Sequence, residues 1–287
     1  MRPIVFLLLF GMLGQIPGWA ADTVDCAERQ WVDRLYSGDW RDEDFAWLIS
    51  RAPLPPLMES AYRALAPLTA LNPEASLDAV DLESARKRLR AVYDQWRALP
   101  EPGADELYAA LIVSSTLARI ELNQHHYLAA WRFGRIMLEI AEDFRARFPG
   151  DSRPVMFQQM HAYHSGRAPT VLRPLVHLLG MPSDSKAAVV AVEKFATEST
   201  ALAPEAARVL LAEIKPRDRK PCRYLRLADD LVRTYPANQY FHWLRWRERN
   251  RCPYTSSQVN MELPGLAPSC PPAGPVTGLQ GSKPSIN

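Results

Sequence analysis

The sequence predicts an all-α fold of stacked antiparallel helical hairpins, arranged as a right-handed solenoid or as a compact helical array. Three observations predict it. Between residues 24 and 251 apolar residues recur every three or four positions, and no stretch alternates between apolar and polar residues long enough to indicate a strand. The connections between the expected helices are about two to six residues long, which makes successive helices antiparallel neighbours. Proline stands at first helical positions and glycine where the chain leaves a helix, at Pro154, Pro204, Pro221, Gly166 and Gly180.

The first 20 residues have the pattern of a secretory signal peptide. Arg2 precedes an apolar run from Pro3 to Leu13, and Gly18 and Ala20 are the small residues expected before a cleavage point. The apolar run is shorter than the roughly 20 residues needed to span a membrane, so a retained membrane anchor is the less favoured alternative. We therefore expect an exported, periplasmic chain that begins near Ala21 and is soluble after cleavage.

The expected helices follow one another along the chain. Residues 31–48 are expected to form two short helices, and residues 53–68 to be helical only between their prolines. An apolar stripe predicts a helix over residues 82–96, with Asp81 as its N-cap and Pro100 as its stop. Further helices are expected over residues 107–120, 127–144, 154–165, 171–179, 185–197, 204–215, 221–235 and 238–251.

The helical pattern ends at the start of the C-terminal segment. Residues 253–287 contain seven prolines and four glycines, and Glu262 and Lys283 are their only charged residues. This composition is typical of an extended, mostly disordered tail. The chain is therefore expected to consist of a signal peptide (1–20), a helical domain (21–252) and the tail (253–287).

Four cysteines remain after the expected cleavage, and an even number in an exported chain indicates disulfides. Cys222 opens one expected helix and Cys252 follows the last residue of the next, so antiparallel packing of these helices brings the two together. A bridge there contributes about 3 to 4 kcal/mol by the chain-entropy argument. Cys26 and Cys270 would then pair by elimination. Free or metal-binding cysteines are the alternative, but the chain has no Cys-x-x-Cys pattern and no zinc-like spacing of cysteine and histidine.

Two segments look alike, ARFPGD at residues 146–151 and RTYPAN at residues 233–238. Each ends an amphipathic helix, and a proline after the second helix of a pair is typical of tetratricopeptide repeats. Residues 160–241 also resemble a stretch of exported bacterial tetratricopeptide-like proteins, although Lys215 stands where such a repeat usually has an aromatic residue. The matching features are Tyr163-His164, Leu172 to Pro174, Leu178 to Gly180 and Tyr235 to Asn238. The resemblance implies a helical-repeat adaptor without catalytic residues or a cofactor of its own.

The histidines offer the main alternative, a metal-binding or enzymatic protein. His161 and His164 share one helix face, and His125 and His126 lie at the joint of the preceding hairpin, so the four could contribute to a metal site. No acidic residue lies in the helix of His161, and the chain contains no His-Glu-x-x-His motif. We therefore expect packing histidines, no bound metal and no enzymatic activity.

The C-terminal helices are basic. Twelve basic and five acidic residues between Arg208 and Arg251 give this segment a charge of +7, whereas the whole chain carries +2. Arginines also alternate with Trp243 and Trp246. This pattern favours either arginine stems that cover tryptophan rings or peripheral contact with anionic lipid or lipopolysaccharide, and we expect no nucleic-acid partner.

The leading prediction is a non-catalytic scaffold or adaptor that binds another protein in cell-envelope assembly or secretion. Helical-repeat scaffolds bind partners through exposed side chains on their inner helices. On that basis Arg208, Tyr224 and Arg245 are the predicted partner-binding residues.

Overall fold

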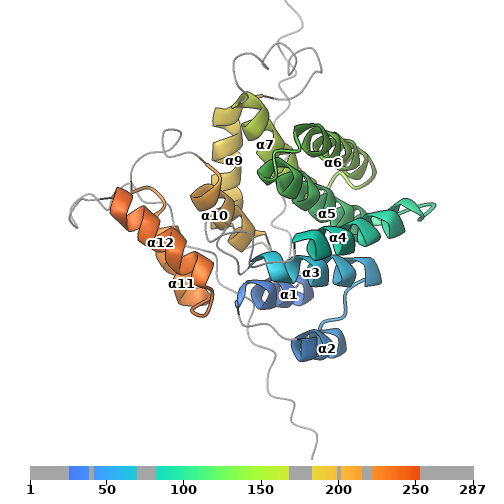
Figure 1. Cartoon of the computed structure of the whole chain (residues 1–287), viewed down its shortest axis with the longest axis horizontal. Helices are drawn as coiled ribbons and strands as arrows, with labels where there is room; N and C mark the ends of the chain where they lie inside the picture. The colour runs from blue at the N-terminus through green and yellow to red at the C-terminus, as the bar shows by residue number, and fades with distance from the viewer. Residues whose placement is uncertain are drawn as a thin grey trace, which may run out of the picture.

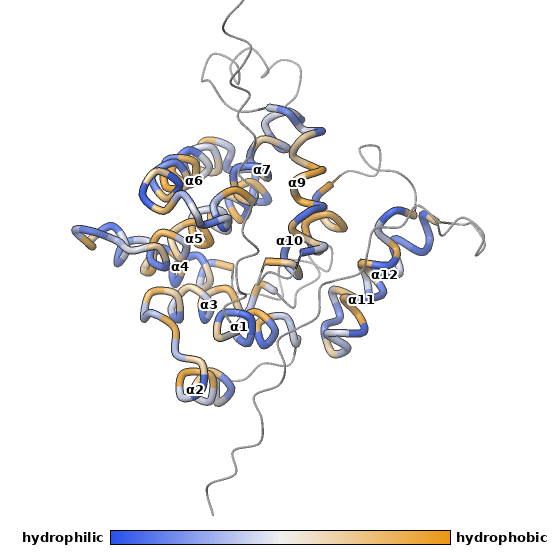
Figure 2. The backbone as a smooth tube through the Cα atoms, turned by 180° about the vertical axis from the view of Figure 1, so that it is seen from behind, coloured by the Kyte–Doolittle hydropathy of each residue, from blue (hydrophilic) through white to orange (hydrophobic). Residues whose placement is uncertain are grey.

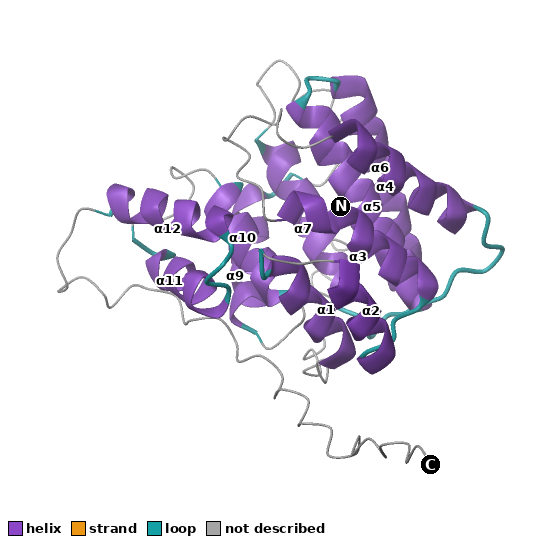
Figure 3. Cartoon of the chain, turned by 60° about the horizontal axis from the view of Figure 1, so that its bottom comes forward, coloured by secondary structure: helices purple, strands orange, loops and turns teal. Residues whose placement is uncertain are grey.

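The computed structural model describes residues 26–38, 42–69, 82–167, 183–198, 202–214 and 222–252. Within these residues every regular element is a helix, and there are eleven of them (Figure 3). The prediction of an all-α fold is therefore confirmed. The expected signal peptide, the expected helix over residues 171–179 and the expected tail lie outside the described residues.

Most helices begin and end within three residues of the expected positions. In chain order they are α1 (Cys26–Tyr36), α2 (Asp42–Arg51), α3 (Pro56–Thr69), α4 (Leu82–Arg97), α5 (Ala104–Asn123), α6 (Tyr127–Arg147), α7 (Arg153–Gly166), α9 (Ser185–Thr197), α10 (Ala203–Ala212), α11 (Leu225–Thr234) and α12 (Gln239–Arg251). None of the described helices is both long enough and apolar enough to cross a membrane.

Helix α1 begins at Cys26, five residues before the expected start, and two further boundaries also differ from the sequence-based expectation. Helix α11 begins at Leu225 and not at residue 221, because Cys222 has a φ of 62°, which a right-handed helix does not include. Helix α3 continues through Pro67, although helix was expected only between the prolines. Pro67 lies in the last turn, where it removes one backbone hydrogen bond, and Thr69 Oγ1 ties this turn to the carbonyl oxygen of Leu35 at 2.8 Å.

Contacts run between successive helices from α3 to α12, and α5 also packs on α3 and α7 (Figure 1). Helix α5 is buried on nearly all sides because its residues are apolar around the whole helix, and Figure 2 shows hydrophobic residues along α5, α9 and α10. Helix α6 packs on α5 and α7 through residues such as Met137 and Phe144. The first turns of α6 remain open to solvent, although its broad apolar stripe favoured burial.

Helix α1, the first helix of the described chain, contacts the last helix, α12, and the turn before it (Figure 1). The ring of Tyr36 stacks on that of Phe241 with centroids 5.5 Å apart, and Asn238 Nδ2 donates to the carbonyl oxygen of Tyr36 at 2.9 Å. Gly38 makes this approach possible, since its φ is 84° and a Cβ atom there would lie 2.7 Å from the Cα of Asn238. The turn between α11 and α12 therefore packs directly on the end of α1.

A disulfide joins Cys222 to Cys252, with the Cα atoms 5.1 Å apart. It closes the α11–α12 pair at the end opposite the turn that contacts α1. This pairing was predicted from antiparallel packing. Cys270, the predicted partner of Cys26, lies outside the described residues.

Candidate functional site

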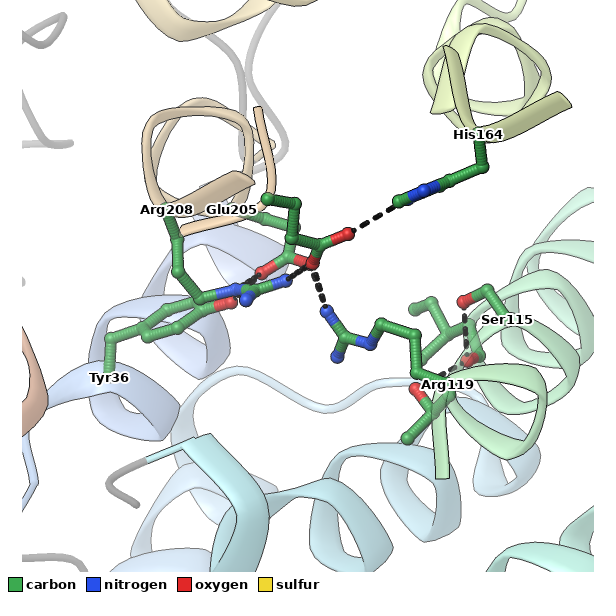
Figure 4. Close-up of polar contacts among 9 residues, drawn as sticks. Tyr36, Ser115, Arg119, His164, Glu205 and Arg208 are labelled. Carbon is green, nitrogen blue, oxygen red and sulfur yellow. Dashed lines mark hydrogen bonds and ion pairs between the residues drawn. The ribbon is translucent and has the colours of Figure 1, made fainter. Parts of the chain in front are cut away.

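Charged side chains from four parts of the fold meet between α1, α5, α7 and α10 (Figure 4). We call this cluster the central ion network. Its members are Tyr36 of α1, Arg119 of α5, His164 of α7, Glu205 and Arg208 of α10, and Glu213 directly after α10.

Arg208 lies at the middle of the network, with its side chain only 10% exposed. Its Nε and Nη2 atoms each donate to a carboxylate oxygen of Glu205 at 2.7 Å, and Nη2 also donates to Glu213 at 2.9 Å. Arg119 Nη1 reaches the same oxygen of Glu213 at 2.8 Å. The other Glu213 oxygen lies 3.2 Å from His164 Nε2, and the Tyr36 hydroxyl donates to Glu205.

These contacts fix the protonation states of the Glu205 and Glu213 carboxyl groups and of the Tyr36 hydroxyl. Burial alone would raise the pKa of Glu213, but Arg119, His164 and Arg208 outweigh it and hold that pKa well below its usual value. The pKa of Glu205 is also lowered, because Arg208 and Arg119 outweigh its burial. Burial and the Glu205 charge raise the pKa of Tyr36. Near neutral pH both carboxyls are therefore anions that can give up no proton, and the network suits structural bonding better than acid catalysis.

Another buried acidic residue, Glu28, lies at the start of α1. Its side chain accepts from the Tyr62 hydroxyl at 3.1 Å and lies 3.6 Å from Arg153, whose guanidinium covers the Tyr108 ring at 4.7 Å. Burial raises the pKa of Glu28, and Arg153 only partly offsets this effect. The sequence analysis missed Glu28, although a signal exists. It lies three and seven residues before Trp31 and Leu35, on the apolar stripe of α1.

The four histidines of the metal-site alternative have separate neighbours. His161 Nδ1 lies 3.1 Å from Ser165 Oγ, whereas His164 belongs to the central ion network. His125 Nδ1 lies 3.1 Å from the Tyr127 hydroxyl, and His126 Nδ1 lies 2.9 Å from a Glu121 carboxylate oxygen. No group of three or more histidine, cysteine, aspartate or glutamate side chains is placed to hold a metal ion within the described ranges.

His161 is half-buried, and its surroundings disfavour a charged imidazole. Burial, followed by the nearby His164 and Arg135, lowers the pKa of His161 to about 4. Its ring carbon Cδ2 lies 3.7 Å from where a Cβ atom on Gly134 would stand, so the ring packs against α6. His161 is therefore a neutral packing residue near pH 7.

The predicted partner-binding residues all contact other parts of the chain. Arg208 is the middle of the central ion network. Tyr224 is 1% exposed and donates to Glu193 at 2.7 Å. Arg245 lies 2.9 Å from Asp229. Two of the three side chains are therefore buried, and a partner that contacted them directly would have to displace these bonds.

The basic residues of α12 are also engaged within the fold. The Arg247 guanidinium lies over the Trp243 ring at 4.5 Å, as the alternative of arginine stems covering tryptophans predicts. Arg249 pairs with Asp229 at 2.9 Å and Arg251 with Glu248 at 3.5 Å. These pairs reduce the positive charge that α12 offers to an anionic surface.

An open pocket of about 460 Å³ lies between α4 and α6, and we call it the α4–α6 pocket. It is lined by Tyr93, Trp96, Arg97, Leu107, Arg132, Ile136, Glu139, Ile140 and Asp143. The Trp96 indole N–H is buried without a hydrogen-bond acceptor in the described part of the structure. Arg97 and Arg132 form no ion pair with any described carboxylate, whereas Glu139 and Asp143 pair with Arg135 and Arg147 of their own helix.

Large apolar side chains are exposed where α5 meets α6. We call them the hairpin patch, which consists of Leu122 (45% exposed), Tyr127 (63%), Leu128 (85%) and Trp131 (46%). The patch lies on the end of α5 and on the turns of α6 that precede the α4–α6 pocket. Exposed apolar residues that cluster in this way are typical of interaction sites, whereas isolated ones are normal.

Comparison of the chain with protein-family models, with curated proteins and with solved structures finds no match in any of the three.

Proposed function

We propose that the chain is a non-catalytic scaffold that binds another protein through the hairpin patch. The observation that carries this proposal is the exposure of Leu122, Tyr127, Leu128 and Trp131 on one hairpin, with Leu128 85% exposed. Tyrosine and tryptophan are enriched at protein interfaces, since they bury a large apolar surface with little loss of conformational entropy. A partner that covers the patch removes this surface from water.

The state of the titratable groups supports a binding role. Glu205 and Glu213 are neutralised by Arg119 and Arg208, and His161 is neutral near pH 7. A general acid or base needs a pKa near the working pH and access to a substrate, and these groups have pKa values displaced away from neutrality. The strongest ionic contacts of the molecule thus hold helices together.

The proposal places the scaffold in the periplasm and treats its helical hairpins as a tetratricopeptide-like array. The signal-peptide pattern of residues 1–20 supports the location. The packing of successive helices from α3 to α12 and the Tyr-Pro-x-Asn turn at residues 235–238 support the architecture. The role that follows is that of an adaptor in cell-envelope assembly or secretion.

The test is capture of envelope proteins by the purified chain and by two variants of the hairpin patch, Leu128→Glu and Trp131→Glu. We expect a protein that the unchanged chain captures to be lost with both variants, because a charge desolvated in an apolar interface costs several kcal/mol. Val190→Glu is the matched control, since Val190 is 65% exposed on α9, away from the patch. A captured protein that persists with both patch variants would contradict the proposal.

A further inference from the structure

The outer side of the α11–α12 pair carries arginines and an exposed tryptophan. Arg226 and Arg233 lie seven residues apart and therefore share one side of α11. Arg245, Trp246 and Arg249 lie within four residues of one another and share one side of α12. The two helices pack on α10 and form one edge of the described fold (Figure 1). We call these five residues the arginine face.

The position of Asp229 shows that the two sets of arginines lie side by side. Asp229 stands three residues after Arg226 and four before Arg233, on the same side of α11. Its Oδ1 atom lies 2.9 Å from Arg245 Nε and 2.9 Å from Arg249 Nη2 on α12. One carboxylate oxygen is thus shared by two guanidinium groups, which leaves one of their positive charges in excess.

The charges that residues 222–252 expose to solvent are mostly positive. These residues contain seven arginines and three acidic residues. Two of the acidic side chains, Asp230 and Glu248, are buried. Arg233 pairs with the buried Asp230, but its own side chain is 77% exposed. Asp229 is therefore the one carboxylate that this segment offers to solvent, against several exposed guanidinium groups.

Arg226 adds a charge that the fold does not use. It is exposed and forms no ion pair with any described residue. Arg249 is 52% exposed and shares its carboxylate with Arg245. A guanidinium group binds phosphate oxygens through two parallel donors, so a surface that carries phosphates can complete the bonding of these arginines.

Trp246 favours a membrane over a dissolved anion. Its side chain is 61% exposed among the arginines, where a single phosphate would leave its ring in water. Tryptophan suits the headgroup region of a bilayer, because its apolar ring and its polar N–H are both accommodated there. Arg226 and Arg233 are also about 10 Å apart along α11, too far to converge on one phosphate. A plane of headgroups can contact all of these side chains at once.

We propose that the arginine face binds peripherally to a membrane surface that contains anionic phospholipids. Its guanidinium groups contact headgroup phosphates, and the Trp246 ring enters the headgroup region. The inference goes beyond the proposed scaffold function, because it uses a different part of the molecule from the hairpin patch. It adds a contact that holds the scaffold at the membrane while the hairpin patch binds its protein partner.

The test is sedimentation of the purified chain, beginning at Ala21, with vesicles of equal parts phosphatidylglycerol and phosphatidylcholine. We expect binding at low ionic strength that weakens as salt shortens the Debye length and that phosphatidylcholine alone does not support. Arg226→Gln should weaken binding about fivefold, and Arg226→Gln with Arg249→Gln roughly 25-fold, since each arginine contributes a similar factor at an anionic surface. The fold keeps its bonds in both variants, because Asp229 retains Arg245.

Arg97→Gln is the matched control, since Arg97 is an exposed arginine of α4 without an ion pair to any described residue. It removes the same charge from a different part of the molecule and should leave vesicle binding nearly unchanged. The proposal is overturned if the anionic vesicles do not bind the chain, if neutral vesicles bind it equally, or if Arg97→Gln weakens binding as much as Arg226→Gln does.

Vesicles with brominated acyl chains test the position of Trp246, because bromine quenches the fluorescence of indole rings that enter the lipid. Quenching should be largely lost in Trp246→Phe and kept in Trp131→Phe, which removes the tryptophan of the hairpin patch. The reverse result would place the hairpin patch on the membrane and contradict the proposal. Binding to soluble poly-glutamate as tight as to vesicles, without quenching, would assign the face to an acidic protein and overturn it as well.

The proposed scaffold function and this inference fail separately. Protein capture that is lost with Leu128→Glu and Trp131→Glu supports the hairpin patch whether or not the vesicles bind the chain. Vesicle binding that is lost with the Arg226 and Arg249 variants supports the arginine face whether or not a partner protein is captured.

Discussion

The central ion network and the α4–α6 pocket both contain arginines beside aromatic rings, yet they differ in how far their bonds are made within the chain. In the network, Arg208 donates to two carboxylates and is 10% exposed. In the pocket, Arg97 has no ion pair with a described carboxylate and the Trp96 N–H has no acceptor. The network therefore has the bonding of a structural element, whereas Arg97 and the Trp96 N–H keep bonding capacity that the described fold does not use.

The strongest pKa shifts of the described residues fall on groups that are paired within the fold. Perturbed pKa values are frequent at functional sites, but ion networks that hold helices together perturb them as well. Glu213 has its pKa lowered by Arg119, His164 and Arg208 against the effect of burial, and all three partners belong to the fold. Hydrogen-bond donors that have no acceptor distinguish the α4–α6 pocket from the central ion network better than the pKa shifts do.

The largest expected effect is that of Arg208→Met. The change leaves Glu205 without its two charge-assisted hydrogen bonds and Glu213 with Arg119 and His164 only, and we expect the free energy of unfolding to fall by about 3–5 kcal/mol. Urea titration followed by circular dichroism measures it. The matched change in the pocket, Arg97→Met, should stay within about 0.5 kcal/mol.

Equal losses for these two arginine variants would erase the distinction between the regions. A second variant, Glu205→Gln with Arg208→Met, should be more stable than Arg208→Met alone, because it removes a carboxylate charge whose remaining ion-pair partner is Arg119 at 3.7 Å.

The Cys222–Cys252 disulfide lies on helices that do not line the α4–α6 pocket. Replacing Cys222 and Cys252 with serine opens a loop of sequence separation 30, and we expect a loss of about 3 to 4 kcal/mol of unfolding free energy by the chain-entropy argument. The bridge lies on α11–α12, which packs on α10 and contacts α1 through Asn238, so the cost of Arg97→Met at the α4–α6 pocket should be the same with and without the bridge. A different cost would show that the pocket depends on the C-terminal helices.

The environment of His161, beside the central ion network, can be tested by the pH dependence of the free energy of unfolding. Its pKa is about 4 in the fold against about 6.5 in an unfolded chain, so the neutral form is favoured by folding. This contribution is complete above pH 6.5 and is lost as the pH falls from 6.5 toward 4. Between pH 7 and pH 5 the unchanged protein should lose about 2 kcal/mol more unfolding free energy than His161→Gln.

The comparison between the two proteins cancels groups with the opposite pH dependence, such as Glu28, whose raised pKa makes folding more favourable in acid. Parallel pH profiles for the unchanged protein and His161→Gln would show that the imidazole is as solvated in the fold as in the unfolded chain.

The sequence predicted what depends on local periodicity. Helices α4 and α9 begin at the predicted residues, Leu82 and Ser185, whereas Asp81, the predicted N-cap of α4, lies outside the described residues. The Cys222–Cys252 bridge follows from antiparallel packing of two helices of similar length. The contact between α1 and the turn before α12 was not predicted. Tyr36 and Asn238 are 202 residues apart, and no local sequence pattern indicates that they meet.

The surroundings of the predicted partner-binding residues were beyond sequence reasoning for the same reason. Arg208 and Tyr224 were predicted to lie on the exposed inner helices of a helical-repeat scaffold, but their contacts with Glu205, Glu213 and Glu193 hold both side chains within the fold. The apolar stripe of α6 gave no indication of which turns remain uncovered. That depends on how far α5 and α7 extend along it, which is a property of the packed structure.

The smallest expected effect is that of Trp96→Phe. The same substitution at Trp31, whose N–H is bonded within the fold, gives a direct comparison. Trp31 is 1% exposed and donates to the carbonyl oxygen of Ala52 at 2.7 Å, whereas the Trp96 N–H has no acceptor. Trp31→Phe should cost about 2 kcal/mol or more, since it leaves a small cavity and removes a buried hydrogen bond. Trp96→Phe should cost less than about 1 kcal/mol, because it removes a donor that the fold does not use. Urea titration compares the two, and a loss for Trp96→Phe equal to that for Trp31→Phe would mean that its N–H is already bonded in the free protein.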